Sequence, residues 1–260
     1  MSARASARTR PASASLRDFY EDPAVPASSG PDRARRQAEM LAEVLAARGH
    51  GGSSPGASTA VGRPAVILDV GCGDGFATGV AAQRNPGHRF AGLDWSASSL
   101  AKAADRGIAV LRAGIDASLP VRSGSVDVVV MSEVIEHLVD TDSAIEETYR
   151  VLKPGGTLLL STPNLAAWYN RALLALGVQP VFSEVSLRSV FGRPGSQVAG
   201  HLHMFTRRAL VEFLGAYGLD CVRVAGARYH DVPAVLRPLD RVFCRWPSAA
   251  SILLVQARKA

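Results

Sequence analysis

An apolar segment followed at once by a glycine-rich turn is the feature that most constrains this chain. Residues 65–70 read AVILDV, and residues 71–75 read GCGDG. A continuous apolar run of this kind is typical of a strand buried on both faces, as in a parallel sheet. Closely spaced glycines let the backbone turn sharply and direct amide groups at a ligand from the start of a helix. The sequence therefore predicts a strand–turn–helix unit that binds a ligand at residues 71–75.

Apolar runs and amphipathic segments alternate along the rest of the chain. We expect strands at residues 65–70, 88–94, 108–112, 126–131, 157–161, 219–225 and 251–257. We expect helices at residues 33–48, 76–84, 96–106, 141–152 and 206–217, the last of them capped by Thr206. A turn, Lys153-Pro154-Gly155-Gly156, separates the helix at 141–152 from the next strand. This alternation predicts a doubly wound α/β fold with a mostly parallel sheet.

Composition divides the chain into three parts. Residues 1–17 contain little that a core could bury and are expected to be a disordered tail. Residues 18–62 are expected to form an N-terminal helical cap and a Gly/Ser/Pro linker, and residues 63–260 the main domain. Residues 163–200 interrupt the alternation as an insertion after the fifth strand, which predicts a lid over a site. Its aromatic side chains either line an acceptor pocket or form the insertion's own core: Trp168, Tyr169, Phe182 and Phe191.

Charge and cysteine content limit the classes of partner. The net charge is +6, but four arginines lie in the first 17 residues, and without them the charge is +2. The remaining arginines are scattered, which disfavours nucleic acid as a partner. The three cysteines are too few and too dispersed for a disulfide framework and favour the cytoplasm. No apolar run approaches the ~18–20 residues of a membrane span.

Asp94 ends the second predicted strand, about twenty residues after the glycine turn. A carboxylate at this position can accept hydrogen bonds from both hydroxyls of a ribose. The alternative is an acid that faces solvent or caps a helix. The spacing of Gly71, Gly73 and Gly75 does not match the G-x-G-x-x-G pattern of dinucleotide sites, which opposes a nicotinamide dehydrogenase.

Three segments in order along the chain resemble a known family. Residues 67–75 (ILDVGCGDG) resemble the first motif of class I S-adenosylmethionine-dependent methyltransferases, residues 119–130 contain a segment similar to their LPF…GSFDVV, and residues 151–158 (VLKPGGTL) resemble their VLKPGG turn. The resemblance implies a Rossmann-like fold of seven strands, the last antiparallel, and S-adenosyl-L-methionine as the cofactor. It also implies that the first turn holds the methionine portion, Asp94 the ribose, and Trp95 and Asp116 the adenine. The complete set of expected cofactor-binding residues is Asp69, Gly71, Cys72, Gly73, Asp74, Gly75, Asp94, Trp95, Asp116 and Ser132.

Residues 132–138 (SEVIEHL) follow the fourth predicted strand, where side chains face the ligand crevice of a parallel sheet. If this stretch is helical, Glu133, Glu136 and His137 share one face. Two carboxylates and an imidazole placed in this way can bind a divalent ion. The alternatives are that His137 accepts a proton without a metal, or that the group only shapes the pocket.

The EVIEHL segment resembles two branches of the family, the ubiquinone-biosynthesis O-methyltransferases and the small-RNA 2′-O-methyltransferases. In those branches a Glu-x-x-Glu-His set and a later histidine, matched here by His201, hold a metal that positions the acceptor hydroxyl. The resemblance thus implies Glu133, Glu136, His137 and His201 as ligands of Mg²⁺, Mn²⁺ or Zn²⁺.

Together these patterns predict a methyltransferase that acts on oxygen of a small metabolite, with His137 and Glu133 as catalytic residues. An RNA 2′-O-methyltransferase is the alternative within the family, opposed by the modest core charge. A protein that binds the cofactor without catalysis is the alternative from another class. The oligomeric state is not predicted by any of these patterns.

Overall fold

The computed structural model describes the chain with five gaps, so that the described ranges are 31–49, 63–115, 118–195, 198–229 and 232–260. The predicted tail at 1–17, most of the predicted linker, and Asp116 lie outside the described residues.

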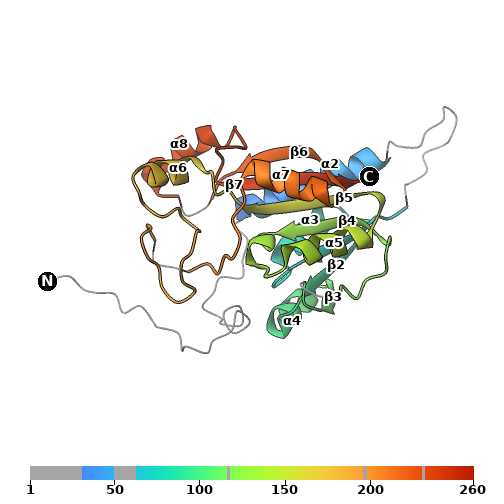
Figure 1. The fold of residues 1–260 in the computed structure, drawn as a ribbon. Helices are drawn as coiled ribbons and strands as arrows, with labels where there is room; N and C mark the ends of the chain where they lie inside the picture. Colours follow the sequence, from blue (N-terminus) through green and yellow to red (C-terminus); the bar gives the residue numbers. More distant parts are fainter. Residues whose placement is uncertain (1–30, 50–62, 116–117, 196–197, 230–231) are drawn as a thin grey trace.

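The centre of the molecule is a seven-stranded sheet in the order β3-β2-β1-β4-β5-β7-β6 (Figure 1). Neighbouring strands from β3 to β5 pair in parallel, and β7 is antiparallel to both of its neighbours. The predicted fold is confirmed. The strands are β1 (Val66–Val70), β2 (Arg89–Asp94), β3 (Ala109–Arg112), β4 (Val126–Ser132), β5 (Leu152–Pro163), β6 (Leu219–Ala227) and β7 (Ile252–Lys259).

Helices cover both faces of this sheet (Figure 1). They are α2 (Pro31–Gly49), α3 (Phe76–Arg84), α4 (Ala97–Asp105), α5 (Thr141–Val151), α6 (Trp168–Ala175), α7 (Arg207–Ala216) and α8 (Arg237–Phe243), with short 3-10 helices η1 (Ile135–His137) and η2 (Ala234–Leu236). Within the described part of the chain, no helix combines the length and apolarity that crossing a membrane demands.

Alternate residues of the central strands build two separate cores. On β4, Val128 and Val130 pack with α2, whereas Val129 and Met131 pack with α5 and α7. Successive side chains of a strand point to opposite faces, so a strand covered on both sides must be apolar throughout. This explains why β1 and β4 read as continuous apolar runs in the sequence.

Helix starts follow the local sequence closely. Thr206 caps α7 by accepting a hydrogen bond from the amide of Ala209 at 3.2 Å, which confirms the predicted cap. Ser96 caps α4 and Asp140 caps α5 in the same way. Such a cap satisfies one amide that the first turn of a helix leaves without a partner.

The fifth strand differs from the prediction, because β5 extends back to Leu152 and includes the expected turn at 153–156. Leu152 pairs with Val126, and the register then shifts so that Thr157 pairs with Val128. The intervening glycines absorb this irregularity, and Gly155 has a φ of 70°. The glycines therefore form a bulge inside a strand and not a turn between elements.

Asp127 of β4 joins the N-terminal helix to the sheet. Its carboxylate accepts hydrogen bonds from the amide of Val66 at 2.9 Å and from Nζ of Lys153 at 2.6 Å, and it pairs with Arg48 of α2. Burial alone would raise the pKa of Asp127, but the hydrogen bonds from Lys153 and Val66 and the charge of Arg48 outweigh it and lower the pKa. The ionised carboxylate therefore stabilises the fold.

We predict that Asp127→Asn lowers the free energy of unfolding by about 2 kcal/mol at pH 7, because hydrogen bonds to a charged group are lost. Folding lowers the pKa of Asp127. The carboxylate therefore stabilises the fold fully at pH values above its pKa in the unfolded chain, and this stabilisation disappears as the pH falls through its pKa in the folded protein. Urea denaturation at pH 7 and near pH 3 measures the change. Glu43→Gln, on the helix α2 that also carries Arg48, removes an exposed pair with Arg223 of β6. It should change the free energy of unfolding by less than about 0.5 kcal/mol. Equal effects of the two variants would contradict this role.

Candidate functional site

The glycine turn after β1 has the backbone conformation that its sequence predicts. Gly71, Gly73 and Gly75 have φ values of 76°, 54° and 74°, in the left-handed region that favours glycine. The amides of Gly71 and Cys72 donate to the carbonyl of Leu93 at 2.7 and 3.1 Å. These bonds fix the turn against the end of β2.

Asp94 at the end of β2 faces this turn. Its Oδ2 accepts a hydrogen bond from the amide of Gly73 at 2.9 Å, and its Oδ1 accepts one from the amide of Ser96 at 2.9 Å. The close approach of β2 also depends on Gly92, where a Cβ would lie 2.6 Å from Sγ of Cys72. The structure therefore brings the turn and Asp94 together, as the sequence predicts.

Asp69, at the foot of the same turn, is buried beside a small cavity between α2, α3 and the sheet. Its Oδ2 accepts a hydrogen bond from Oγ1 of Thr78 at 2.5 Å. Burial, opposed by this hydrogen bond and reinforced by the charge of Asp94, raises the pKa of Asp69 to about 7. The cavity of about 20 Å³ is lined by Asp69, Thr78 and Gln37 among apolar side chains and has room for about one water molecule.

Gln37 of α2 lines the same cavity, next to the end of β4. Ser132, at the end of β4, donates a hydrogen bond from Oγ to Oε1 of Gln37. The side chain of Gln37 is buried, and its Nε2 has no hydrogen-bond partner among the described residues. A buried amide donor left in this state is uncommon in folded proteins and indicates a place for an acceptor.

Two of the other expected cofactor residues are engaged in structural contacts. Asp74 accepts a hydrogen bond from the amide of Phe76 at 3.1 Å and pairs with Arg106 at 3.3 Å. Trp95 is partly buried, and its carbonyl accepts from Nε of Arg112 at 3.1 Å.

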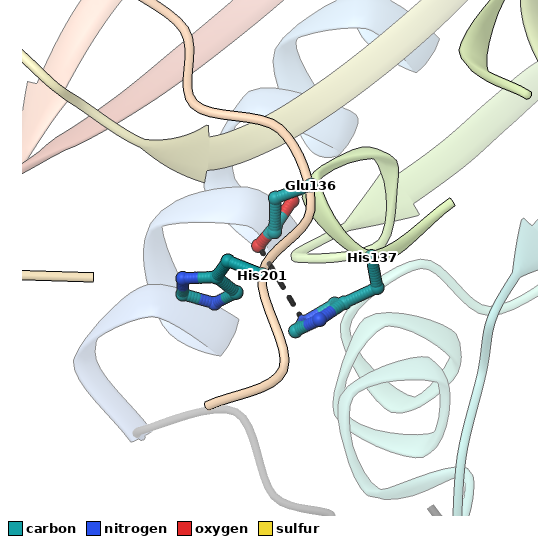
Figure 2. Close-up of side chains that lie close together, drawn as sticks. All are labelled: Glu136, His137 and His201. Carbon is teal, nitrogen blue, oxygen red and sulfur yellow. Dashed lines mark ion pairs between the residues drawn. The ribbon is translucent and has the colours of Figure 1, made fainter. Parts of the chain in front are cut away.

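A second group of polar side chains lies beyond β4. Glu136, His137 and His201 each offer a ligand atom, and these atoms lie within 4.8 Å of one another (Figure 2). Glu136 is fully buried, accepts a hydrogen bond from Oγ1 of Thr162 at 3.0 Å, and lies 3.9 Å from Nε2 of His137. We call these three residues the Glu–His cluster.

Glu133 does not join the Glu–His cluster, and the helix expected to align it is wrong. The segment forms only the short η1, and Glu133 precedes it with a φ of 53°. This backbone turns its carboxylate aside, where Oε1 accepts a hydrogen bond from Oγ of Ser161 at 2.9 Å. The structure thus brings together three of the four expected metal ligands.

Carbonyl groups orient both imidazoles of the cluster. Nδ1 of His137 lies 3.2 Å from the carbonyl oxygen of Gly200, and Nδ1 of His201 lies 3.2 Å from that of Phe182. Because a carbonyl oxygen only accepts, Nδ1 of each ring carries the proton. Burial, and then the neighbouring His137, lower the pKa of His201 to about 3, so this ring is neutral at neutral pH.

Glu184 holds the loop that carries His201. Its carboxylate accepts hydrogen bonds from the amides of Ala199, Gly200 and His201 at 2.5, 2.7 and 3.1 Å. It also forms a buried ion pair with Arg193 at 2.9 Å. Since Gly200 in turn orients His137, one carboxylate positions both histidines.

The aromatic residues after β5 mostly pack among themselves and with α8. Trp168 stacks on Phe243 with centroids 5.5 Å apart, whereas Phe191 is exposed. Phe182 is the exception, because its ring lies 5.3 Å from that of His201. Trp168 therefore packs with Tyr169 of the insertion and, outside it, with Phe243 of α8, whereas Phe182 contacts the cluster.

Three residues of the site were not identified from the sequence. Gln37 carried a signal, since it is a polar residue between Ala34 and Leu41 on the apolar face of its helix. Thr78 and Glu184 carried none, because their roles come from tertiary contacts.

Comparison with known proteins shows what the central part of the chain is similar to. Residues 68–160 match the family model described as "Methyltransferase domain". A probable S-adenosylmethionine-dependent methyltransferase of Mycolicibacterium smegmatis is 42% identical over 99 residues, which are 38% of each chain. A ubiquinone biosynthesis O-methyltransferase of Pseudomonas paraeruginosa is 38% identical over 104 residues, which cover 38% of this chain and 44% of the relative. The matched segment thus spans less than half the length of these curated relatives.

Solved structures share the fold at low identity. An S-adenosylmethionine-dependent methyltransferase from Listeria monocytogenes, described as putative, superposes with a TM-score of 0.56 at 19% identity, covering 89% of this chain and 100% of the other. The geranyl diphosphate C-methyltransferase of Streptomyces coelicolor has a TM-score of 0.53 at 17% identity, over 87% and 77% of the two chains. The predicted resemblance to S-adenosylmethionine-dependent methyltransferases is thus confirmed for residues 68–160, and the solved structures share the fold.

The raised pKa of Asp69 predicts a characteristic pH dependence of stability. The unfolded chain releases this proton near pH 4, whereas the folded protein keeps it up to about pH 7. The folded state therefore binds more protons in this window, and the free energy of unfolding falls as pH rises from 4 to 7. The asparagine of Asp69→Asn cannot titrate, so the free energy of unfolding of this variant should not show this fall. Its value relative to the natural chain should increase by on the order of 2–4 kcal/mol between pH 4 and 7.

Urea denaturation between pH 4 and 8 measures this difference. Thr78→Val is the matched variant, because it removes the hydrogen bond that lowers the pKa of Asp69 and should extend the slope to higher pH. A constant offset between Asp69→Asn and the natural chain would show that Asp69 does not titrate in this range.

Proposed function

We propose that this protein is an S-adenosylmethionine-dependent methyltransferase that methylates an oxygen atom of a small metabolite. The observation that carries the proposal is the meeting of the left-handed glycine turn with the carboxylate of Asp94. In an open α/β sheet, ligands bind outside the carboxyl ends of the strands, which is where these groups lie. The matched family model covers the same strands.

The described residues fit S-adenosylmethionine. Each oxygen of Asp94 has a further lone pair, so the carboxylate can accept from both ribose hydroxyls while it remains bonded to Gly73 and Ser96. The buried Nε2 of Gln37 fits an acceptor such as the carboxylate of the methionine portion. Trp95 is the expected neighbour of the adenine. When bound, this cofactor supplies a methyl group on a positively charged sulfur.

Asp69 adds an electrostatic contribution to the same pocket. In the protein alone, burial keeps its pKa near 7. A cationic ligand beside the turn would favour the ionised carboxylate and lower this pKa. Binding of the cofactor would then release a proton near pH 6.

His137 is the proposed proton acceptor. Its side chain is 19% exposed, while its partner Glu136 is fully buried, so the imidazole is the member of the pair that an acceptor can reach. The bond from Nδ1 to Gly200 orients the ring and leaves the basic Nε2 on the side of Glu136. A neutral imidazole held in this way can remove the proton of a hydroxyl group.

As an alternative, the Glu–His cluster fits a divalent metal ion, in which case Nε2 of His137 would be a ligand and not the proton acceptor. One carboxylate and two imidazoles are a donor set that suits zinc, manganese or iron, and the neutral His201 has a lone pair to offer. Glu136, His137 and His201 would hold the ion, which would orient the acceptor and lower the pKa of its hydroxyl. Glu133 would join them only after its side chain left Ser161.

A small acceptor is favoured by two features. Phe182 presents an aromatic ring beside His201, and the curated relatives include ubiquinone biosynthesis O-methyltransferases. An RNA acceptor is the alternative, and incubation with labelled S-adenosylmethionine and either RNA or a metabolite extract distinguishes the two.

Calorimetry with S-adenosylhomocysteine tests the cofactor site. We expect micromolar binding to the natural chain and none for NAD. Asp94→Ala should weaken binding at least tenfold, because a charge-assisted hydrogen bond contributes about 1.5–3 kcal/mol. Asp105→Ala, on the exposed surface of α4, is the control and should bind as the natural chain does. Binding that is indifferent to Asp94 would refute the proposed site.

Metal titration tests the Glu–His cluster separately. We expect one equivalent of Zn²⁺ or Mn²⁺ to bind, and Glu136→Gln and His201→Ala each to weaken binding at least tenfold, since a ligand to the ion is lost. His203→Ala is the matched control, because the hydrogen bond of His203 to the carbonyl of Glu136 comes from its backbone amide, which alanine keeps. If none of these variants differs from the natural chain, the cluster is not a metal site.

A further inference from the structure

Exposed apolar side chains form a stripe along η2, α8 and the turn that follows α8. Val235, Leu239, Val242 and Trp246 follow one another at intervals of four, three and four residues, the spacing of one helix face. They are 84%, 43%, 43% and 56% exposed. An amphipathic helix normally buries such a face, so this stripe is unusual for a surface helix.

The opposite side of α8 already packs on the protein. Asp240 is buried and accepts hydrogen bonds from Nε1 of Trp168 at 3.1 Å and Oγ of Ser251 at 2.6 Å. Phe243 stacks on Trp168, and Cys244 is buried. The helix is therefore seated by its polar and aromatic side, and the apolar stripe is turned outward.

The neighbouring helix extends the apolar surface. α6 lies beside α8 at one end of the molecule, away from α4 and β3 (Figure 1). Leu174 and Leu176 at the end of α6 are 56% and 78% exposed. We call the exposed side chains of residues 168–176 and 234–246 the α6–α8 face.

Positive charge accompanies these apolar side chains. Arg237 and Arg241 of α8 and Arg245 of the following turn recur every four residues and are exposed, as is Arg171 of α6. Two described segments, residues 165–178 and 232–250, contain α6, η2 and α8. The only acidic residue within them is Asp240, which is buried. The face therefore presents arginine with no exposed carboxylate on these segments to neutralise it.

We propose that the α6–α8 face docks on an anionic membrane surface. Leucine, valine and tryptophan flanked by arginine are the composition of helices that lie in the plane of a lipid interface. The arginines would meet lipid phosphates while Leu239, Val242 and Trp246 enter the boundary of the acyl chains. A second copy of this chain fits less well, because a twofold interface would bring the arginines of both copies together.

Vesicle binding by the full chain tests this proposal without any methyl donor, so its failure leaves the proposed enzymatic function untouched. The probe is a vesicle of equimolar phosphatidylcholine and phosphatidylglycerol, compared with one of phosphatidylcholine alone. We expect co-sedimentation with the anionic vesicle, a blue shift of tryptophan emission, and release at about 0.5 M salt. Leu239→Asp with Val242→Asp, and Arg237→Gln with Arg241→Gln and Arg245→Gln, should each weaken binding at least about tenfold.

Val222→Asp is the matched control, because Val222 is 56% exposed on β6, outside this face. It should bind vesicles as the natural chain does, and all variants should keep the far-ultraviolet circular dichroism of the natural chain. Equal binding to both vesicles, or equal loss in the control, would overturn the proposal. So would a dimer in sedimentation that Leu239→Asp with Val242→Asp dissociates, because the face would then bind a second copy.

Discussion

The hydrogen bond between the amide of Gly73 and the carboxylate of Asp94 is the contact on which the proposed site depends. It exists because β1 and β2 are parallel neighbours, so that the turn after one strand meets the side chain that ends the other. Small residues make this approach possible: Gly92 leaves room for Cys72, and the glycines of the turn accept positive φ angles. A bulkier residue at either place would separate the amides from the carboxylate.

Buried polar groups lie in both parts of the proposed site, at the glycine turn and at the Glu–His cluster. Beside the glycine turn, Asp69 and Gln37 are buried. Asp69 has a raised pKa, and Gln37 has a side-chain amide that lacks a partner in the described structure. Beside the Glu–His cluster, Glu184 and Arg193 hold the loop that carries His201. Buried polar groups destabilise a fold when they are poorly matched, so their concentration at one end of the sheet is consistent with a ligand site there.

Much of the fold could be predicted because its elements are signalled locally. The apolar runs of β1 and β4 and the cap at Thr206 depend on neighbours in sequence, and the structure confirms them. The bulge at residues 153–156 was predicted as a turn, because it lies between two pairings with a distant strand, Leu152 with Val126 and Thr157 with Val128. The positive φ of Glu133 was missed for a similar reason, since nothing local requires it.

The residues of the site likewise fall into those that local sequence predicts and those that only distant contacts place. Asp94 and the glycine turn follow from strand order and spacing, whereas the grip of Glu184 on residues 199–201 depends on the path of a long irregular segment. Gln37 lies between these cases, because a polar residue on an apolar helix face signals that something is unusual but not what it contacts.

A crystal structure of the complex with S-adenosylhomocysteine is the most direct test of the central claim. The account predicts that both ribose hydroxyls donate to the carboxylate of Asp94 while the glycine turn contacts the amino acid portion of the ligand. A ligand bound elsewhere, or a ribose held without Asp94, would contradict it.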